Sequence, residues 1–252
     1  MKCIVDGIAT EYTMIGHGKP VVLMHGWGTS LKDMQGLAKV LSESFHVISV
    51  DFPGFGGSER PKEVWGVGDY AIFIQKFLDK INVKEIFMVV GHSFGGRVVI
   101  AACGRGIMNP QKVVLIGSAG IKHSSSVRTK VFKGIAKTGK VVAALPGLGA
   151  IKDGARRKLY AAAGTSDYID AGEMKEIFSK VIDEDLQVDA SKIPQPTLLV
   201  WGEHDNASPV SDAQRLHQLI KASKLVIIPR AGHFVHNDDT QGVMKAIRDF
   251  LA

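Results

Sequence analysis

Short apolar runs alternate along the chain with longer segments in which apolar residues recur at helical spacing. Runs rich in valine, isoleucine and leucine predict buried strands, and they span Pro20–Met24, Val47–Val50, Glu85–Val90, Lys112–Ile116, Thr197–Trp201 and Lys224–Ile228. Helical spacing predicts helices over Ser30–Ser42, Asp69–Ile81, Phe94–Cys103, Ser211–Lys221 and Thr240–Leu251. At the start of the chain, an Asp6-Gly7 pair between two apolar runs predicts a hairpin over Cys3–Thr10. This alternation predicts an α/β fold with a mostly parallel sheet and helices on both faces.

The alternation stops between residues 121 and 192, where helical spacing continues without a strand-like run. The apolar residues there form two sets, Val127, Val131 and Ile135, and then Met174, Ile177, Phe178, Val181 and Ile182. The stretch Pro146–Gly149 predicts a break between helices. We therefore divide the chain into a first part of the core (1–120), a helical segment (121–192) and a second part of the core (193–252).

The hexapeptide Gly91–Gly96 reads Gly-His-Ser-Phe-Gly-Gly and lies between a predicted strand and a predicted helix. In that setting a G-x-S-x-G motif predicts a sharp turn that holds a serine hydroxyl toward solvent. Glycines at positions 91 and 95 permit the strained turn that bulky residues would block. Ser93 is therefore a candidate nucleophile, and it needs a histidine base held by a carboxylate.

Two residues downstream fit those roles. Asp205 follows the predicted strand Thr197–Trp201, and His233 follows the next strand, Lys224–Ile228. Consecutive parallel strands end at the same edge of a sheet, so we expect Asp205 and His233 to lie side by side. The order Ser, Asp, His is also the chain order of the triad in α/β-hydrolases.

With these residues in view, the chain resembles the α/β-hydrolase family over nearly its whole length. It also has His25-Gly-Trp-Gly after one strand, and the D-x-P-G-x-G-x-S motif of Asp51–Ser58 after the next. The resemblance implies an α/β-hydrolase fold with an eight-stranded, mostly parallel sheet, and it implies that residues 121–192 form a small helical cap. It further implies an oxyanion hole formed by the backbone N–H groups of Trp27 and Phe94.

Other candidates receive lesser roles. His25 and His92 belong to the two motifs and are expected to hold loop geometry, while Asp51 matches a structural turn of the family. His236 lies three residues after His233, but no cysteine or acidic residue stands at ligand spacing from it, so we expect a surface or pocket-lining histidine. We expect neither a metal nor a cofactor. Some relatives place the acid after the sixth strand, where this chain has only Gly117-Ser-Ala, so Asp205 keeps that role.

The composition and the short motifs limit the cellular location and the classes of ligand that we expect. No apolar stretch approaches the roughly 20 residues of a membrane-spanning helix, and the N-terminus lacks a secretion signal, so we expect a cytoplasmic protein that does not enter a membrane. The glycine-rich run Gly54–Gly57 lacks the ending of a phosphate-binding loop, and no nucleic-acid motif is present.

The net charge of +6 is unevenly distributed. Between Ile121 and Tyr160 ten Lys or Arg residues accompany one acid, Asp153. Two interpretations stay open: a solvated helical face, or a landing site for an acidic partner such as an acyl carrier protein.

A serine nucleophile favours acyl chemistry, since the epoxide hydrolases and haloalkane dehalogenases of the resembling family need an aspartate at the turn. We therefore expect a serine esterase that cleaves a small-molecule carboxylic ester through an acyl-enzyme. The motifs are also similar to those of esterases that demethylate a pimeloyl carrier protein and of carbon–carbon bond hydrolases of ring-cleavage products. A hydroxynitrile-cleaving lyase and a slow-turnover ligand receptor remain alternatives. Acyl size, leaving group and oligomeric state are left open.

Overall fold

The computed structural model describes residues 1–122 and 172–252. Its eight strands form a sheet in the order β1-β2-β4-β3-β5-β6-β7-β8. Pairs β1·β2 and β2·β4 are antiparallel, and the remaining neighbours are parallel, which confirms the mostly parallel sheet. The strands are β1 (Lys2–Val5), β2 (Ile8–Ile15), β3 (Pro20–Met24), β4 (His46–Val50), β5 (Met88–His92), β6 (Lys112–Ile116), β7 (Thr197–Gly202) and β8 (Ser223–Ile228).

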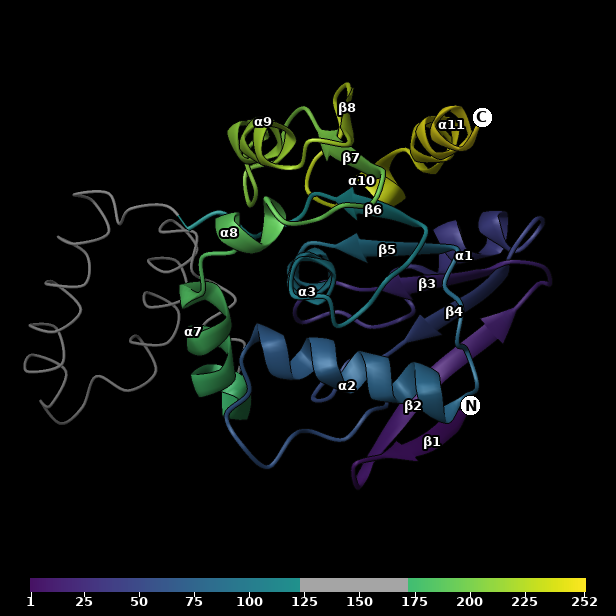
Figure 1. The fold of residues 1–252 in the computed structure, drawn as a ribbon, viewed down its shortest axis with the longest axis vertical. Coiled ribbons are helices and arrows are strands. Elements are labelled where there is room, and N and C mark those ends of the chain that lie inside the picture. The colour runs from purple at the N-terminus through teal and green to yellow at the C-terminus, as the bar shows by residue number, and fades with distance from the viewer. Residues whose placement is uncertain (123–171) are drawn as a thin grey trace, which may run out of the picture.

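Helices cover both faces of this sheet (Figure 1). On one face, α2 (Val67–Lys80), α3 (Phe94–Gly104), α8 (Gln187–Ala190) and α9 (Val210–Leu219) pack over side chains such as Val22 and Met24. On the other face, α1 (Gln35–Leu41), α10 (Val235–Asp238) and α11 (Thr240–Leu251) pack over Val21 and Leu23. Successive strand residues point to opposite faces, so the continuous apolar run of β3 supplies both halves of the core.

Two predicted elements have different bounds. The strand predicted over Glu85–Val90 is displaced to Met88–His92, because it continues pairing with β6 up to His92 opposite Ile116. The helix predicted from Ser30 begins only at Gln35. The residues before it form turns instead, and the Leu31 N–H donates to the buried carboxylate of Asp51 at 2.6 Å.

The described part of the predicted cap contains a short 3₁₀ turn, Gly172–Met174, and α7 (Lys175–Asp183). Four members of its apolar set are buried as expected, namely Met174, Ile177, Phe178 and Val181. Ile182, the last residue of the set, is 49 % exposed. It lies near the end of α7, where it lines a cavity instead. The set Val127, Val131 and Ile135 and the break at Pro146–Gly149 lie outside the described residues.

Within the described ranges, no helix has the length and apolar character needed to cross a membrane.

Candidate active site

Ser93 lies at the sharp turn between β5 and α3 that the sequence predicts. Its backbone has φ 51° and ψ −108°, a region that non-glycine residues seldom occupy and that costs of order 1–3 kcal/mol. The turn is also sterically closed: a Cβ on Gly95 would lie 2.3 Å from the carbonyl oxygen of Met24, and one on Gly91 would lie 2.7 Å from the backbone of Gly95. The two glycines are therefore required by close backbone approach.

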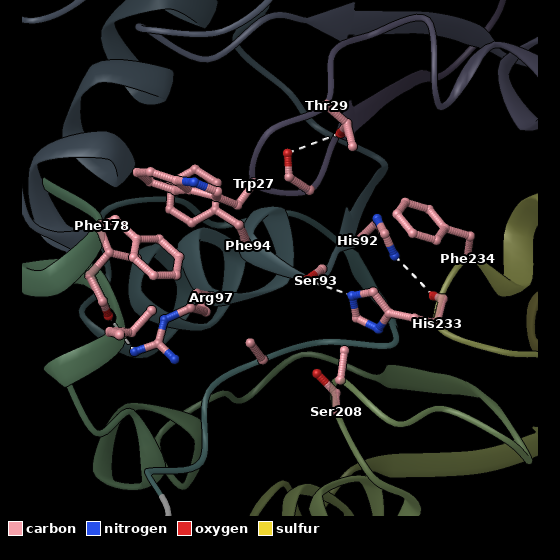
Figure 2. A pocket seen from close by; sticks show the side chains of 15 residues that line it. Trp27, Thr29, His92, Ser93, Phe94, Arg97, Phe178, Ser208, His233 and Phe234 are labelled. Atoms are coloured by element: carbon pink, nitrogen blue, oxygen red, sulfur yellow. Dashed lines mark hydrogen bonds between the residues drawn. The ribbon is translucent and has the colours of Figure 1, made fainter. Parts of the chain in front are cut away.

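Ser93, His233 and Asp205 lie within hydrogen-bonding distance of one another in a row, as the sequence predicts. The Oγ of Ser93 is 2.9 Å from His233 Nε2, and His233 Nδ1 is 2.9 and 3.1 Å from the two carboxylate oxygens of Asp205 (Figure 2 shows the first of these contacts). A carboxylate only accepts, so Nδ1 carries the proton and Nε2 is left to accept from the serine hydroxyl. This is the arrangement that proton transfer from Ser93 requires.

Asp205 is itself held in place. It is buried, and its Oδ1 accepts the backbone N–H groups of Ala207 and Ser208 at 2.9 and 2.8 Å. These amides fix the orientation of the carboxylate toward His233. The turn that follows β7 therefore positions Asp205.

The predicted oxyanion donors lie in two segments that are bonded to each other. The Gly95 N–H donates to the carbonyl of His25 at 3.0 Å, which joins the start of α3 to the loop that carries Trp27. In the described part of the chain, neither the Trp27 N–H nor the Phe94 N–H has a hydrogen-bond acceptor. A Cβ on Gly26 would lie 3.5 Å from Ser93 Cβ, so this loop borders the serine. Both amides are thus available to a ligand.

His25 holds this loop through a tautomer that its neighbours dictate. The Phe52 N–H donates to His25 Nε2 at 3.1 Å, so that nitrogen must carry the lone pair. Nδ1 therefore carries the proton and donates to the Gly26 carbonyl at 2.7 Å. The ring is fully buried, and burial lowers its pKa, which keeps it neutral. His25 holds loop geometry, as predicted.

Asp51 also has the structural role that its motif predicts. It is buried, and its two oxygens accept the N–H groups of Leu31 at 2.6 Å and Gly57 at 2.8 Å. The carboxylate thereby joins the turn after β4 to the segment that precedes α1.

His236 differs from its prediction. It is fully buried, and its Nε2 lies 3.1 Å from the carboxylate of Asp33, so it is not a surface histidine. Its acidic partner is 203 positions away in the chain, a separation at which spacing rules give no signal. His92, also buried, has Nε2 3.0 Å from the backbone carbonyl of His233. It supports the catalytic candidate's backbone, which agrees with its expected role in holding loop geometry.

A cavity of about 380 Å³ opens beside Ser93. The aromatic rings of Trp27, Phe94 and Phe178 form one wall, and Phe234 lies on the opposite side (Figure 2). The lining also includes Val181, Ile182, Ala119, Ala207 and Ser208. Trp27 packs against Phe94 and Phe178 at ring-centroid distances of 5.3 and 5.0 Å. Residues from α7 thus contribute to this wall.

Arg97 is a cavity residue that the sequence reasoning missed. It lies one helical turn after Ser93, and that spacing was the available signal. Its guanidinium donates to the carbonyl oxygens of Val181, at 2.6 Å, and Glu184. Burial lowers its pKa to about 10. Ser208 and Phe234 were also missed, although each is adjacent to a motif residue or its turn.

Comparison with known proteins gives relatives that are hydrolases. A 2-hydroxy-6-oxo-2,4-heptadienoate hydrolase of Pseudomonas putida is 27% identical, with 99% of this chain and 95% of the relative covered. A monoacylglycerol lipase of Xenopus laevis is 24% identical, with coverages of 96% and 79%.

Solved structures agree in fold. A bacterial membrane phospholipase A is 25% identical, with a TM-score of 0.77 and coverage of 100% of this chain and 84% of the other. An enol-lactonase of Burkholderia xenovorans is 22% identical, with a TM-score of 0.77 and coverages of 100% and 99%, and this likeness concerns the fold alone. The model of one family, described as the alpha/beta hydrolase family, matches residues 21–246. The chain belongs to the α/β-hydrolase family.

Proposed function

We propose that the protein is a serine esterase that cleaves a small-molecule carboxylic ester through an acyl-enzyme. The observation that carries the proposal is the 2.9 Å contact between Ser93 Oγ and His233 Nε2, at a turn whose serine borders a cavity. Asp205 fixes the tautomer of His233 that this contact needs. A serine at this turn favours acyl transfer, since it forms an acyl ester rather than an alkyl ester.

The residues present are sufficient for both halves of such a reaction. Ser93 Oγ attacks the ester carbonyl carbon while His233 Nε2 takes the hydroxyl proton, and the charge that develops on the carbonyl oxygen is met by the N–H groups of Trp27 and Phe94. His233 then returns the proton to the leaving alkoxide, which departs as an alcohol. Water attacks the acyl-enzyme with the same base, and Ser93 is regenerated.

The cavity suits a modest apolar acyl group. Its volume of about 380 Å³ lies at the lower end of typical ligand pockets of about 300–1,000 Å³. The aromatic wall formed by Trp27 and Phe178 offers apolar surface, and the hydroxyl of Ser208 offers a polar group on the other side. We infer that the segment 121–192 acts as a cap, a proposal that the α7 residues in this wall support.

Covalent labelling tests the nucleophile. A fluorophosphonate probe should add to Ser93 in the wild-type protein, with the adduct located by peptide mass spectrometry. Ser93→Ala should abolish both the label and the turnover of p-nitrophenyl esters. Ser208→Ala is the matched control, since it removes another cavity hydroxyl and should still be labelled. Labelling or turnover that survives in Ser93→Ala would refute the proposal.

Carbon–carbon bond hydrolysis is the second candidate, because the relatives that match include two hydrolases of oxo-dienoates at 27% and 28% identity. The same serine site would serve that reaction on a vinylogous diketone substrate. Comparison of kcat/KM for a 2-hydroxy-6-oxo-dienoate with that for a panel of p-nitrophenyl esters of increasing acyl length separates the two. A higher value for the dienoate would replace the ester assignment.

Two further hypotheses, a ligand receptor and an acyl carrier protein as partner, each have their own test. A ligand receptor with this fold would show ligand-induced thermal stabilisation with little turnover. An acyl carrier protein as an acidic partner remains a proposal that depends on the basic stretch 121–160, of which residues 123–160 lie outside the described ranges. If an acyl carrier protein fails to bind at both low and high salt, this proposal is refuted.

A further inference from the structure

Three potential metal ligands meet next to the proposed catalytic histidine, and they come from distant parts of the chain. Asp33 precedes α1, His92 ends β5, and His236 lies in α10. Asp33 Oδ2 is 3.1 Å from His236 Nε2 and 3.9 Å from His92 Nδ1. One ligand atom from each residue lies within 4.8 Å of the other two. No contact described for the proposed reaction uses Asp33 or His236.

The tautomer of His92 leaves a bare lone pair in this cluster. Its Nε2 faces the carbonyl oxygen of His233 at 3.0 Å, and a carbonyl only accepts, so Nε2 carries the proton. Burial, followed by the charges of His236 and His233, lowers the pKa of His92 well below its usual value, so the ring is neutral and Nδ1 is an acceptor. Nδ1 is buried, has no hydrogen-bond partner in the described structure, and faces the carboxylate of Asp33.

Hydrogen bonding within the cluster does not account for this arrangement. The bond between His236 and Asp33 and the bond between His92 and the His233 carbonyl use one nitrogen of each ring. The Nδ1 atoms of both rings are buried without a partner among the described residues, although a buried polar atom normally has one. An acceptor nitrogen and a carboxylate oxygen that face each other leave room for a cation, or for a water that donates to both, between them.

We propose that Asp33, His92 and His236 form a binding site for a zinc-like divalent cation. Zinc takes imidazole nitrogen and carboxylate oxygen at about 2.0–2.2 Å in a tetrahedral arrangement, and the ligand atoms of the three residues, all within 4.8 Å of one another, need only small shifts to reach one ion. His236 offers Nε2 as the third ligand once its proton moves to Nδ1. Magnesium and calcium prefer oxygen ligands, so two imidazoles select against them.

The surroundings suit such a site. Ligating histidines usually donate their other N–H to a carbonyl or carboxylate, and His92 does so through Nε2. The side chain of Asp33 is 16% exposed while both rings are buried, so water reaches the cluster from the side of Asp33 and supplies a fourth ligand. Three protein ligands and an open position form a site that takes up and releases its ion.

An ion bound there would inhibit the enzyme, and this consequence rests on the proposed function. The rings of His92 and His233 have centroids 5.0 Å apart, and His233 must become a cation while it holds the proton of Ser93. The positive charge of an ion on His92 would repel this neighbouring cation in a partly buried site. Zinc should therefore lower kcat and leave the binding of uncharged substrate nearly unchanged.

Calorimetric titration of chelator-treated protein with zinc chloride tests the site. The wild type should bind one equivalent, and Asp33→Asn and His236→Gln should each weaken binding by at least the roughly 10- to 100-fold that loss of an outer-shell partner costs. His204→Gln is the matched control, because His204 and Glu203 form an exposed pair 4.0 Å apart that could bind zinc adventitiously. Absence of binding by the wild type, or equal affinity in all variants, would overturn the proposal.

Two further measurements keep the outcome decisive. Cobalt bound by the wild type should give the strong visible absorption of tetrahedral coordination. This measurement needs no variant, so it does not depend on whether a variant folds. Weak absorption typical of six-coordinate cobalt would count against the site. Zinc should inhibit ester turnover by the wild type and His204→Gln, but not by His236→Gln. Zinc binding without esterase activity would refute the proposed function alone, and activity without binding would refute the zinc site alone.

Discussion

Replacement of His25 by alanine tests how the proposed oxyanion loop is held. His25 is fully buried and bridges two backbone groups, accepting from Phe52 N–H at 3.1 Å and donating to the Gly26 carbonyl at 2.7 Å. His25→Ala leaves the buried Phe52 N–H without an acceptor, at about 1–3 kcal/mol, whereas the Gly26 carbonyl keeps the Thr29 hydroxyl at 3.0 Å. The free energy of unfolding should therefore fall by at least about 1–3 kcal/mol, a sizeable share of the typical 5–15 kcal/mol.

The same change should impair turnover more than binding. The Gly26 carbonyl and the Trp27 N–H belong to one peptide group, so release of the carbonyl frees the proposed oxyanion donor to rotate. Loss of one such donor costs about 100- to 1,000-fold in kcat, which is the upper bound here. Thr29 Oγ still donates to the same carbonyl at 3.0 Å, so we expect a smaller loss, of about 10- to 100-fold.

The assay is kcat and KM for a p-nitrophenyl ester, with Tm measured on the same preparation. His25→Gln serves as a second variant of similar volume in case the alanine variant does not fold. His17→Ala is the control, because His17 is exposed in the loop between β2 and β3 and should change neither quantity. A folded His25 variant whose kcat equals that of the wild type would refute the link between this ring and the donor.

Three other changes have defined outcomes. Asp205→Asn keeps an oxygen that accepts from the amides of Ala207 and Ser208, but its side-chain amide would donate to His233 Nδ1 and force the ring proton onto Nε2. The kcat should therefore fall by about 10⁴ with Tm nearly unchanged. A small loss of activity would contradict this assignment. Gly95→Ala places a Cβ 2.3 Å from the backbone oxygen of Met24, so Tm should fall by an amount equivalent to about 1–3 kcal/mol or more, and an unchanged melting curve would disprove the predicted clash. Burial lowers the pKa values of His25 and His92, so below about pH 6.5 the unfolded chain binds protons that the folded chain does not. Thermal melts between pH 7.5 and 5 should therefore show the free energy of unfolding decreasing by up to about 1.4 kcal/mol per pH unit for each ring. A flat profile would show that these two histidines do not lower the stability in acid.

The sheet and the row of Ser93, His233 and Asp205 could be predicted because each depends on local sequence and on one topological rule. Apolar runs mark the parallel strands, and residues just past their carboxyl ends gather at one edge. Asp205 and His233 follow β7 and β8, neighbours in the sheet, so their contact was expected although 28 positions separate them.

Other features depend on packing that local patterns do not encode. The contact of Asp33 with His236 joins a turn before α1 to α10 across 203 positions, so the sequence predicted only a surface or pocket-lining histidine at 236. The late start of α1 has a similar cause, because the buried carboxylate of Asp51 binds the Leu31 amide and holds that segment out of the helix. In both cases a buried polar group found its partner through the tertiary fold.

Arg97, one helical turn beyond the proposed nucleophile, joins α3 to the end of α7. From α3, the Arg97 guanidinium donates to carbonyl oxygens at the end of α7. An outward movement of α7, which carries Phe178 and Ile182, would leave this buried cation without those acceptors. These hydrogen bonds therefore resist widening of the cavity on the side of α7. Opening of the cavity on the α7 side therefore requires both of these hydrogen bonds to break.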